Sequence, residues 1–268
     1  MKQDDRAIGI FDSGLGGLTI LKEVHALLPR ENLIYFGDTA HVPYGSKSKE
    51  TVTEYSLNIA RFLESKKVKL IIIACNTASA LALSAVKKHT KAPVLGVISP
   101  GAKCAVNKNK GGKVAVLGTE ATVKSKAYVK EIAKLDKKTE VKQYACPLFV
   151  PVIEEGILNG ELLDLVINKY LAPLKKMKPA AVILGCTHYP VIKKHISRIL
   201  GGKTLLVDSA EETAKEAKKL LTEKGLLKQN GKGKIEIYAS DSPARFSKLA
   251  VNIIGGKKPK VKENRFYI

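Results

Sequence analysis

Short apolar runs recur along the whole chain, and most of them are continuous rather than alternating with polar residues. Continuous apolar runs are typical of strands that are buried on both faces, as in parallel sheets. The runs that predict strands are IGIF, NLIYFG, LIIIAC, VLGVI, KVAVLG, KQYAC, AVILGC, TLLVD and IEIYA.

Segments with helical spacing separate these runs, for example ETVTEYSLNIARFLESK at 50–66 and AYVKEIAKLDKK at 127–138. Strands that alternate with helices predict an α/β fold with parallel sheets. In open sheets of this kind, ligands bind beyond the carboxyl ends of the strands. The residues that directly follow each run are therefore the first candidates for function.

Those residues are polar or reactive. They are Asp12-Ser13, Asp38-Thr39, Cys75-Asn76-Thr77, Thr119, Cys186-Thr187-His188 and Asp208-Ser209. Taken singly, each of them is explained by helix capping or, for cysteine and histidine, by ordinary burial. The number of such sites argues for a shared function.

The two halves of the chain also resemble each other weakly, since IGIFDSG and IIIACNTASA match VAVLGTEAT and VILGCTHYP. Asp12 and Cys75 are 63 positions apart, and Thr119 and Cys186 are 67 apart. We therefore expect two similar domains, 1–98 plus 211–268 and 99–210, related by a pseudo-twofold axis. The C-terminal part would return to the first domain and end in a tail, GGKKPKVKENRFYI. Each domain would bring one cysteine to a cleft between them.

The formal charge is +21 over 268 residues, from 46 basic and 25 acidic side chains. A basic surface attracts polyanions without sequence preference. However, only six of the basic residues are Arg, the side chain preferred for bidentate readout of phosphates and bases. The lysines also lie along predicted helices, where they form solvated faces. We expect no specific nucleic-acid partner.

Four cysteines lie far apart, at positions 75, 104, 146 and 186. No segment resembles a signal peptide, and no apolar stretch reaches the roughly 18 residues of a membrane span, so we expect a cytoplasmic protein without a membrane partner. Thiols stay reduced there, so disulfides are not expected. Metal sites usually show closely spaced ligands, and the only such pair is Cys186 with His188, so no metal is expected.

A cysteine that opens a helix meets free backbone N–H groups and the positive end of the helix dipole. These favour the thiolate and are expected to lower the pKa of Cys75. Two thiols on opposite sides of one carbon can act as base and acid, one removing a proton and the other returning one. This chemistry inverts the carbon, as in racemisation or epimerisation.

Seven stretches together resemble the glutamate racemases of the aspartate/glutamate racemase superfamily. They are FDSGLGGLTI, YFGDTAHVPYGSKS, ACNTASA, GVISPG, LGTEATVKS, LFVPVIEEG and ILGCTHYPVI. The resemblance implies two flavodoxin-like domains with the active site between them. It also implies a cofactor-independent enzyme that interconverts L- and D-glutamate and supplies D-glutamate for peptidoglycan. A homodimer is compatible with it.

The resemblance places the two catalytic cysteines at Cys75 and Cys186. It assigns Asp12 a place near the first cysteine, and it makes His188 and Glu154 assistants of the second. The substrate-contacting positions it implies are Asp12, Ser13, Tyr44, Gly45, Asn76, Thr77, Thr119, Thr122, Thr187 and His188. Neutral donors of this kind suit the two carboxylates of glutamate, and an aspartate suits its ammonium group.

Other functions are compatible with some of these residues. A racemase of aspartate or another acidic amino acid would use the same chemistry. Cys186 and His188 could form the dyad of a thiol hydrolase, which needs one cysteine only. A polyanion-binding protein rests on the lysine excess alone. Pyridoxal phosphate dependence would need a Schiff-base lysine and a phosphate cradle, and the glycines of GLGG at 14–17 match no phosphate-loop pattern.

Overall fold

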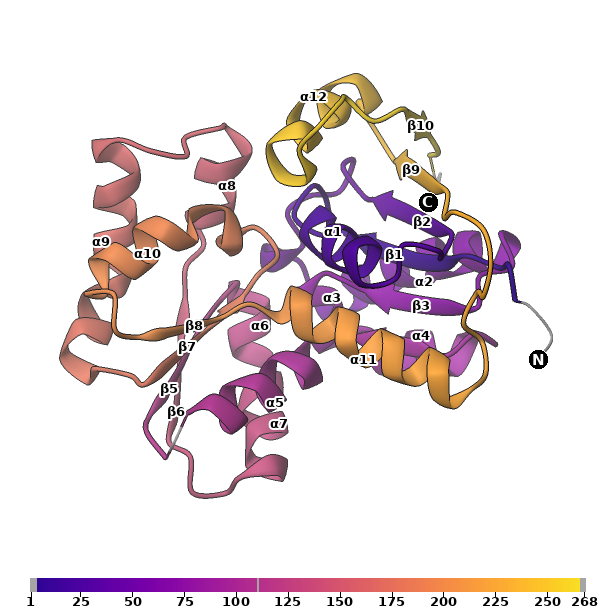
Figure 1. Ribbon diagram of the computed structural model, residues 1–268. Coiled ribbons are helices and arrows are strands. Elements are labelled where there is room, and N and C mark those ends of the chain that lie inside the picture. The colour runs from indigo at the N-terminus through magenta and orange to yellow at the C-terminus, as the bar shows by residue number, and fades with distance from the viewer. Residues whose placement is uncertain (1–3, 110, 266–268) are drawn as a thin grey trace.

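The computed structural model describes residues 4–109 and 111–265, whose strands form two separate sheets (Figure 1). The strands are β1 Ile8–Asp12, β2 Leu33–Gly37, β3 Leu70–Ile73, β4 Val94–Gly96, β5 Val114–Gly118, β6 Val141–Ala145, β7 Ala181–Gly185, β8 Leu205–Val207, β9 Ile235–Ala239 and β10 Val261–Glu263. The first sheet has the order β10-β9-β2-β1-β3-β4, and the second has the order β6-β5-β7-β8. Neighbouring strands run parallel in both sheets, which confirms the α/β prediction.

The second sheet repeats the central part of the first. The order β2-β1-β3-β4 corresponds strand for strand to β6-β5-β7-β8. Cys75 follows shortly after β3, and Cys186 follows β7, which is the equivalent strand. The weak internal likeness of the sequence therefore reflects a repeated topology that places the two cysteines at matching strand ends.

Helices cover both faces of each sheet. They are α1 Leu18–Leu27, α2 Lys49–Ser65, α3 Asn76–Leu81, α4 Leu83–His89, α5 Ile98–Lys108, α6 Glu120–Ser125, α7 Ala127–Leu135, α8 Phe149–Glu154, α9 Glu161–Met177, α10 Lys193–Ile199, α11 Ser209–Glu223 and α12 Pro243–Ile254. Two short 3-10 helices, η1 Tyr44–Ser46 and η2 Tyr189–Ile192, lie in loops.

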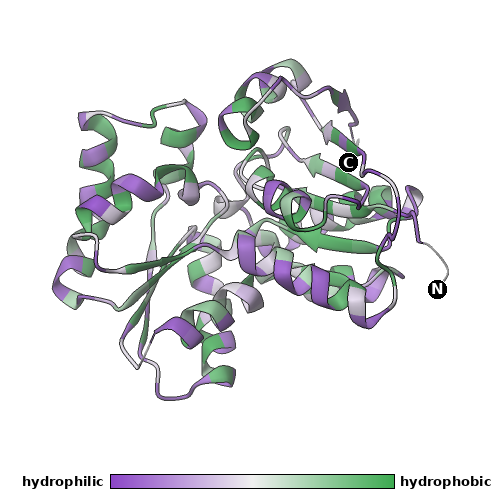
Figure 2. Ribbon diagram, in the orientation of Figure 1, coloured by the Kyte–Doolittle hydropathy of each residue, from purple (hydrophilic) through white to green (hydrophobic). Residues whose placement is uncertain are grey.

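Four clusters of buried apolar side chains hold these layers together. In the first sheet, α1, α11 and α12 pack on one face and α2, α3 and α4 on the other. In the second sheet, α8, α9 and α10 pack on one face and α5 and α7 on the other. Figure 2 shows the apolar strands inside and the polar helix faces outside. Burial on both faces explains why these strands have continuous apolar sequences.

The C-terminal part of the chain pairs and packs with the first sheet. Helix α11 packs along α1, β9 pairs with β2, and β10 pairs with β9. The interpretation of GGKKPKVKENRFYI as a tail was wrong for Val261–Glu263, which form β10. This edge strand is polar and only partly buried, so it lacks the apolar run by which the other strands were found.

A buried ion pair fixes the loop that follows α11 to the first sheet, at the end remote from the strand-end cysteines. Lys69 Nζ lies 2.6 Å from Glu31 Oε2, and both side chains are almost fully buried. Lys69 Nζ also donates to the carbonyl oxygen of Leu226 at 2.7 Å, and Glu31 Oε1 accepts from the Lys228 N–H. Because the charges are paired and further hydrogen-bonded, their burial is tolerated.

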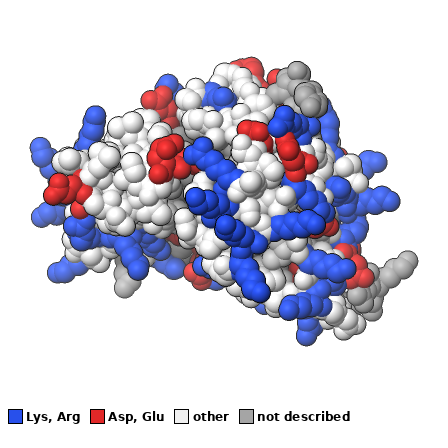
Figure 3. Space-filling model, turned by 90° about the horizontal axis from the view of Figure 1, so that it is seen from above, with Lys and Arg blue, Asp and Glu red and all other residues white. Residues whose placement is uncertain are grey.

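The excess of basic residues is spread over the surface. Figure 3 shows Lys and Arg side chains across much of one face, with Asp and Glu side chains between them. Several of the lysines pair with carboxylates on their own helix, such as Lys215 with Glu211 and Glu212. Exposed pairs of this kind contribute little to stability, because solvent screens the attraction between their charges.

Candidate active site

The carboxyl ends of the central strands of both sheets meet at one small pocket. Residues from both halves of the chain line it: Ser13, Val42, Pro43, Tyr44, Gly45, Cys75, Asn76, Thr77, Thr119, Val150, Cys186, Thr187 and His188. The two predicted cysteines therefore face the same space from equivalent strand ends. Both are buried and free of disulfide bonds.

Cys75 is the N-cap of α3, and its sulfur accepts the Ala78 N–H at 3.5 Å. The thiol in turn lies 3.9 Å from Ser13 Oγ, to which it donates. The expectation that the helix start lowers the pKa of Cys75 was wrong. Complete burial and the negative charge of Asp12 raise that pKa to about 12, and the hydrogen bond from Ala78 offsets only part of the shift. Cys75 is therefore a protonated thiol at neutral pH.

Cys186 has a different neighbourhood, made by His188 and Glu154. Cys186 Sγ lies 3.8 Å from His188 Nδ1, and His188 Nε2 lies 2.6 Å from Glu154 Oε1. Burial opposes protonation of His188, but its hydrogen bonds and charge interactions with Cys186 and Glu154 raise its pKa well above the usual range. Burial likewise favours a neutral Glu154, yet His188 holds the pKa of this carboxyl below its ordinary value. The pair is therefore an imidazolium and a carboxylate.

Asp12 lies beneath the pocket and does not line it. Its Oδ2 accepts the N–H groups of Gly14 and Gly17 at 3.2 and 3.0 Å, and its Oδ1 accepts the hydroxyl of Thr187 at 3.2 Å. Burial raises the pKa of Asp12, while the positive charge of His188 and these hydrogen bonds oppose the shift. Asp12 thus joins the β1 loop to the strand end that carries Cys186.

The glycines of GLGG permit this close approach. A Cβ atom at Gly16 would overlap with Thr187 Oγ1 and lie 2.8 Å from His188 Nδ1. A Cβ atom at Gly17 would lie 2.5 Å from Asp12 Cβ. A larger residue at position 16 would push the β1 loop away from the opposite wall, and one at position 17 would collide with Asp12 in the loop's own half.

Asn76, at the first turn of α3, has one satisfied and one unsatisfied end. Its Oδ1 accepts the hydroxyl of Tyr128 at 2.7 Å. Its Nδ2 is buried and finds no hydrogen-bond partner within the described part of the chain. Because unpaired buried donors are costly, this amide group is a strong candidate for binding a ligand anion.

Three threonine hydroxyls connect the two halves of the chain beside the pocket. Thr77 Oγ1 lies 2.9 Å from Thr119 Oγ1 and 3.4 Å from Thr122 Oγ1, and Thr119 donates to Thr122 at 3.0 Å. Thr119 also accepts the Thr122 N–H as the N-cap of α6. Gly45 packs on this group, since a Cβ atom there would lie 2.6 Å from Thr119 Cβ.

Asp38 holds the loop that carries Tyr44. Tyr44 Oη donates to Asp38 Oδ2 at 2.5 Å, and Ser240, directly after β9, donates to Asp38 Oδ1 at 2.7 Å. Ser240 Oγ also accepts the Ala40 N–H at 2.9 Å. The C-terminal return therefore anchors a wall of the pocket.

The structure thus brings ten of the thirteen predicted site residues to the pocket wall. Asp12 and Thr122 stand one layer behind it, and Glu154 reaches it through His188. Sequence reasoning missed Val42, Pro43 and Val150, which also line the pocket. Valine and proline carry no chemical signal, although all three lie within the stretches that resemble the racemases.

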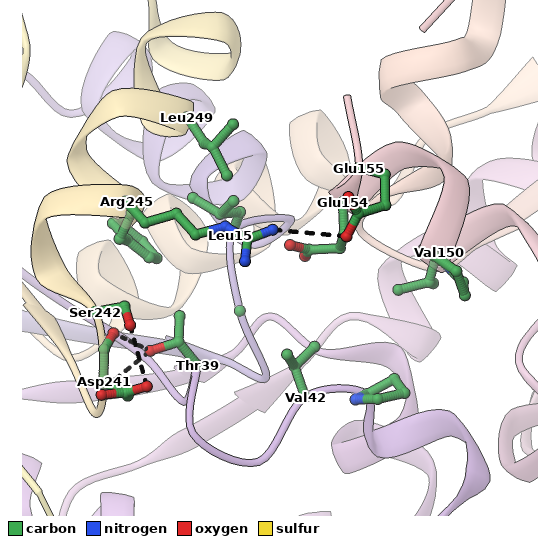
Figure 4. A pocket seen from close by; sticks show the side chains of 14 residues that line it. Leu15, Thr39, Val42, Val150, Glu154, Glu155, Asp241, Ser242, Arg245 and Leu249 are labelled. Carbon is green, nitrogen blue, oxygen red and sulfur yellow. Dashed lines mark hydrogen bonds and ion pairs between the residues drawn. The ribbon is translucent and has the colours of Figure 1, made fainter. Parts of the chain in front are cut away.

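A larger, more open pocket adjoins the first and shares Val42, Pro43 and Val150 with it (Figure 4). In Figure 4, Arg245 extends from α12 toward Glu155, whose carboxylate lies 3.7 Å from the guanidinium. Glu154 also lines this outer pocket, so its side chain contacts both the outer pocket and His188. The outer and inner pockets therefore lie next to each other, with the three shared residues between them.

Two kinds of site were not found in the residues that the structure describes. Within 4–109 and 111–265, no group of three or more His, Cys, Asp or Glu side chains could hold a metal ion. No helix in the same residues is long and apolar enough to cross a membrane.

Comparison with known proteins agrees with this arrangement. A sequence profile described as Asp/Glu/Hydantoin racemase matches residues 16–217. The chain belongs to this family. The glutamate racemase of Geobacter metallireducens is 49% identical to it over 253 residues, which cover 94% of each chain.

Solved structures of this racemase family superpose on the whole molecule. The glutamate racemase of Francisella tularensis in complex with D-glutamate matches with a TM-score of 0.91 and 39% identity, over 97% of this chain and 98% of the other. Glutamate racemase isoform RacE1 of Bacillus anthracis matches with a TM-score of 0.94 and 36% identity, over the same shares. The two-domain racemase fold predicted from the sequence is confirmed.

Proposed function

We propose that the chain is a glutamate racemase that interconverts L- and D-glutamate with two cysteines and supplies D-glutamate for peptidoglycan. The observation that carries this proposal is the pair Cys75 and Cys186, which lie at equivalent strand ends and line a single pocket. A reaction that removes a proton from one face of a carbon and returns one to the other needs such a pair. The named relatives, which are glutamate racemases, support the choice of substrate.

The two cysteines take opposite roles in the proposed reaction, one as base and the other as acid. In one direction, the Cys186 thiolate, paired with the His188 imidazolium, takes the Cα proton and becomes a thiol. The Cys75 thiol then gives its proton to the opposite face of the carbanion and becomes a thiolate. In the other direction the roles are exchanged, so the two proton transfers balance. Because the products are mirror images of equal free energy, kcat/KM is the same in both directions.

The carbanion step needs stabilisation of charge on the α-carboxylate. Because the Thr187 hydroxyl already donates its one proton to Asp12, we assign this role to the Asn76 amide, with Ser13, Thr77 and the backbone N–H groups near the helix starts as further donors. Each donor of this kind is worth roughly 3–4 kcal/mol at the transition state. We assign to Asp12 the positioning of Thr187, which the 3.2 Å hydrogen bond between them supports.

The domain division follows the same proposal. We assign residues 1–98 plus 211–268 to the first domain and 99–210 to the second. Its support is that β9 and β10 pair into the first sheet, whereas β5 to β8 form the second. We also assign the enzyme to the cytoplasm, which the four free cysteines support. The homodimer and the absence of a specific nucleic-acid partner stay predictions.

Deuterium incorporation tests the proposed reaction. L-Glutamate incubated in heavy water with the purified chain and no added cofactor should lose optical rotation and acquire deuterium at Cα. L-Aspartate under the same conditions tests the related substrate. Loss of rotation with aspartate but not glutamate would reassign the substrate, and no exchange with either amino acid would overturn the proposal.

One observation favours a second candidate, a thiol hydrolase. Cys186, His188 and Glu154 form a thiol, imidazole and carboxylate series with separations of 3.8 and 2.6 Å, similar to a catalytic triad. A hydrolase needs only Cys186, so an acyl group trapped on Cys186 together with full activity of Cys75→Ala would favour it.

A further inference from the structure

The buried phenol of Tyr128 contacts the pocket residue Asn76 from the other half of the chain. Tyr128 lies on α7, beside the second sheet, whereas Asn76 lies on α3, beside the first. The hydroxyl of Tyr128 donates to Asn76 Oδ1 at 2.7 Å. Within the described residues, this oxygen is the only acceptor found for the Tyr128 proton.

An asparagine amide has nearly the same shape in its two flipped orientations, but the two ends have opposite hydrogen-bonding character. With Oδ1 on Tyr128, the donor Nδ2 is the end left without a partner, in a side chain that lines the pocket. The flipped amide would turn a carbonyl oxygen toward an anionic ligand and leave the Tyr128 proton unpaired. Both effects disfavour the flip.

The ring of Tyr128 is fixed as well. It is fully buried among the side chains of α5, α7 and the second sheet. A Cβ atom at Gly185 would lie 3.2 Å from its Cε2, and a Cβ atom at Gly101 would lie 3.4 Å from its Oη. Since Gly185 directly precedes Cys186, the same ring contacts the strand end of one cysteine and the amide beside the other.

We propose that Tyr128 is a positioning residue, which fixes the Asn76 amide so that its NH2 group faces the substrate α-carboxylate. This inference rests on the proposed racemase function. Burial in addition raises the pKa of Tyr128, so the phenol keeps the proton it donates. Tyr128 does not touch the reacting atoms and acts only through Asn76.

Tyr128→Phe removes the hydroxyl and keeps the ring. We expect kcat/KM for racemisation to fall about tenfold in each direction, the size of effect expected when one buried hydrogen bond is lost. Tyr189→Phe is the matched control, because Tyr189 is equally buried and its hydroxyl donates to a backbone oxygen, that of Cys146, at 3.0 Å. The control should lose similar thermal stability and keep kcat/KM within about threefold.

A double-mutant cycle shows whether Tyr128 acts through Asn76. In the Asn76→Ala background, Tyr128→Phe should lower kcat/KM by less than about threefold, since no amide remains to be oriented. A full tenfold loss in that background, or equal kcat/KM in the Tyr128→Phe and Tyr189→Phe variants, would overturn the positioning role. A wild-type chain that does not racemise would instead overturn the proposed function.

A second variant tests the orientation even where Tyr128→Phe does not fold. Asn76→Asp keeps an acceptor for the Tyr128 hydroxyl but turns a carboxylate oxygen toward the substrate. It should therefore lower kcat/KM more than Asn76→Ala does. An Asn76→Asp variant at least as active as Asn76→Ala contradicts the assignment of the NH2 group to the substrate side.

Discussion

The two cysteines occupy the same place in two repeats of one topology, yet their surroundings have opposite electrostatic character. Cys75 lies near the carboxylate of Asp12, and together with burial this charge keeps it a protonated thiol. Cys186 lies beside an imidazolium that Glu154 stabilises. A repeated scaffold thus provides two similar thiol positions, while the charged groups beside them differ: a carboxylate near Cys75 and an imidazolium near Cys186.

The largest expected effect comes from removing either thiol. Cys75→Ala and Cys186→Ala should each lower racemisation by more than about a thousandfold, because one of the two proton transfers loses its group. Optical rotation measured with each enantiomer checks this. Cys104→Ala serves as the control, since Cys104 is buried away from the pocket and should be dispensable.

Glu154→Gln reduces the difference between the two cysteine environments, because it weakens the positive charge beside Cys186. It removes the carboxylate that raises the pKa of His188, and it should lower kcat by about ten- to a hundredfold. Activity that needs the imidazolium is lost as pH rises through the pKa of His188. The basic limb of the pH profile of kcat should therefore move to lower pH in this variant.

The stability of the fold should also decrease as pH rises through the pKa of His188, as the activity does. The pKa of His188 is raised on folding, so the stabilisation from its protonation is complete below its unfolded value of about 6.5 and declines as pH rises through the folded value. Glu155→Gln is the matched control, because Glu155 is exposed and, among residues 4–109 and 111–265, Arg245 is its only charged partner. An unchanged basic limb in Glu154→Gln, or an equal shift in Glu155→Gln, would argue against the imidazolium.

Asp12→Asn tests the other side of the comparison. Loss of the negative charge should lower the pKa of Cys75 and so raise the fraction of thiolate, which is the reactive form. Iodoacetamide should therefore modify Cys75 roughly several-fold faster near pH 9. Mass spectrometry resolves the site, with Cys104 as an internal standard. We also expect kcat/KM to fall about tenfold, because Thr187 loses a charged acceptor. Slower modification of Cys75 would contradict the role given to Asp12.

The smallest effect is expected from Ser240→Ala, which leaves both cysteine environments intact. It removes the hydroxyl that joins Asp38 and Ala40 to the end of β9, and KM should rise about threefold as the Tyr44 loop loosens. Ser247→Ala removes a comparable hydrogen bond to the Pro259 carbonyl oxygen on the same C-terminal segment. Titration of initial rates against glutamate should show no change in KM for that control.

The sequence predicted the parts of this molecule that are coded locally. Continuous apolar runs identified nine strands, and the polar residues after them identified most of the pocket wall. Strand β10 was missed because its residues, Val261–Glu263, form a polar edge. The pKa of Cys75 was predicted in the wrong direction because the helix start is visible in the sequence, whereas burial and the approach of Asp12 arise only from the fold.

Partners that are distant in sequence could not be predicted from local patterns. Asp38 stood out as a strand-end residue, but its partner Ser240 is 202 positions away. Tyr128 lies in the segment 127–138, which was predicted only as a helix, and its partner Asn76 belongs to the other half of the chain. Such contacts depend on how distant segments of the chain pair within a sheet or meet between the two halves, which no local pattern encodes.

The return of the chain to the first sheet has a consequence for the order of synthesis. A ribosome completes both cysteine-bearing strand ends long before it releases β9 and Ser240, which anchors the Tyr44 loop through Asp38. Until then, β2 is a sheet edge without its β9 neighbour, and the Tyr44 loop has no anchor on that side. A nascent chain therefore carries both thiols before the wall beside them is anchored.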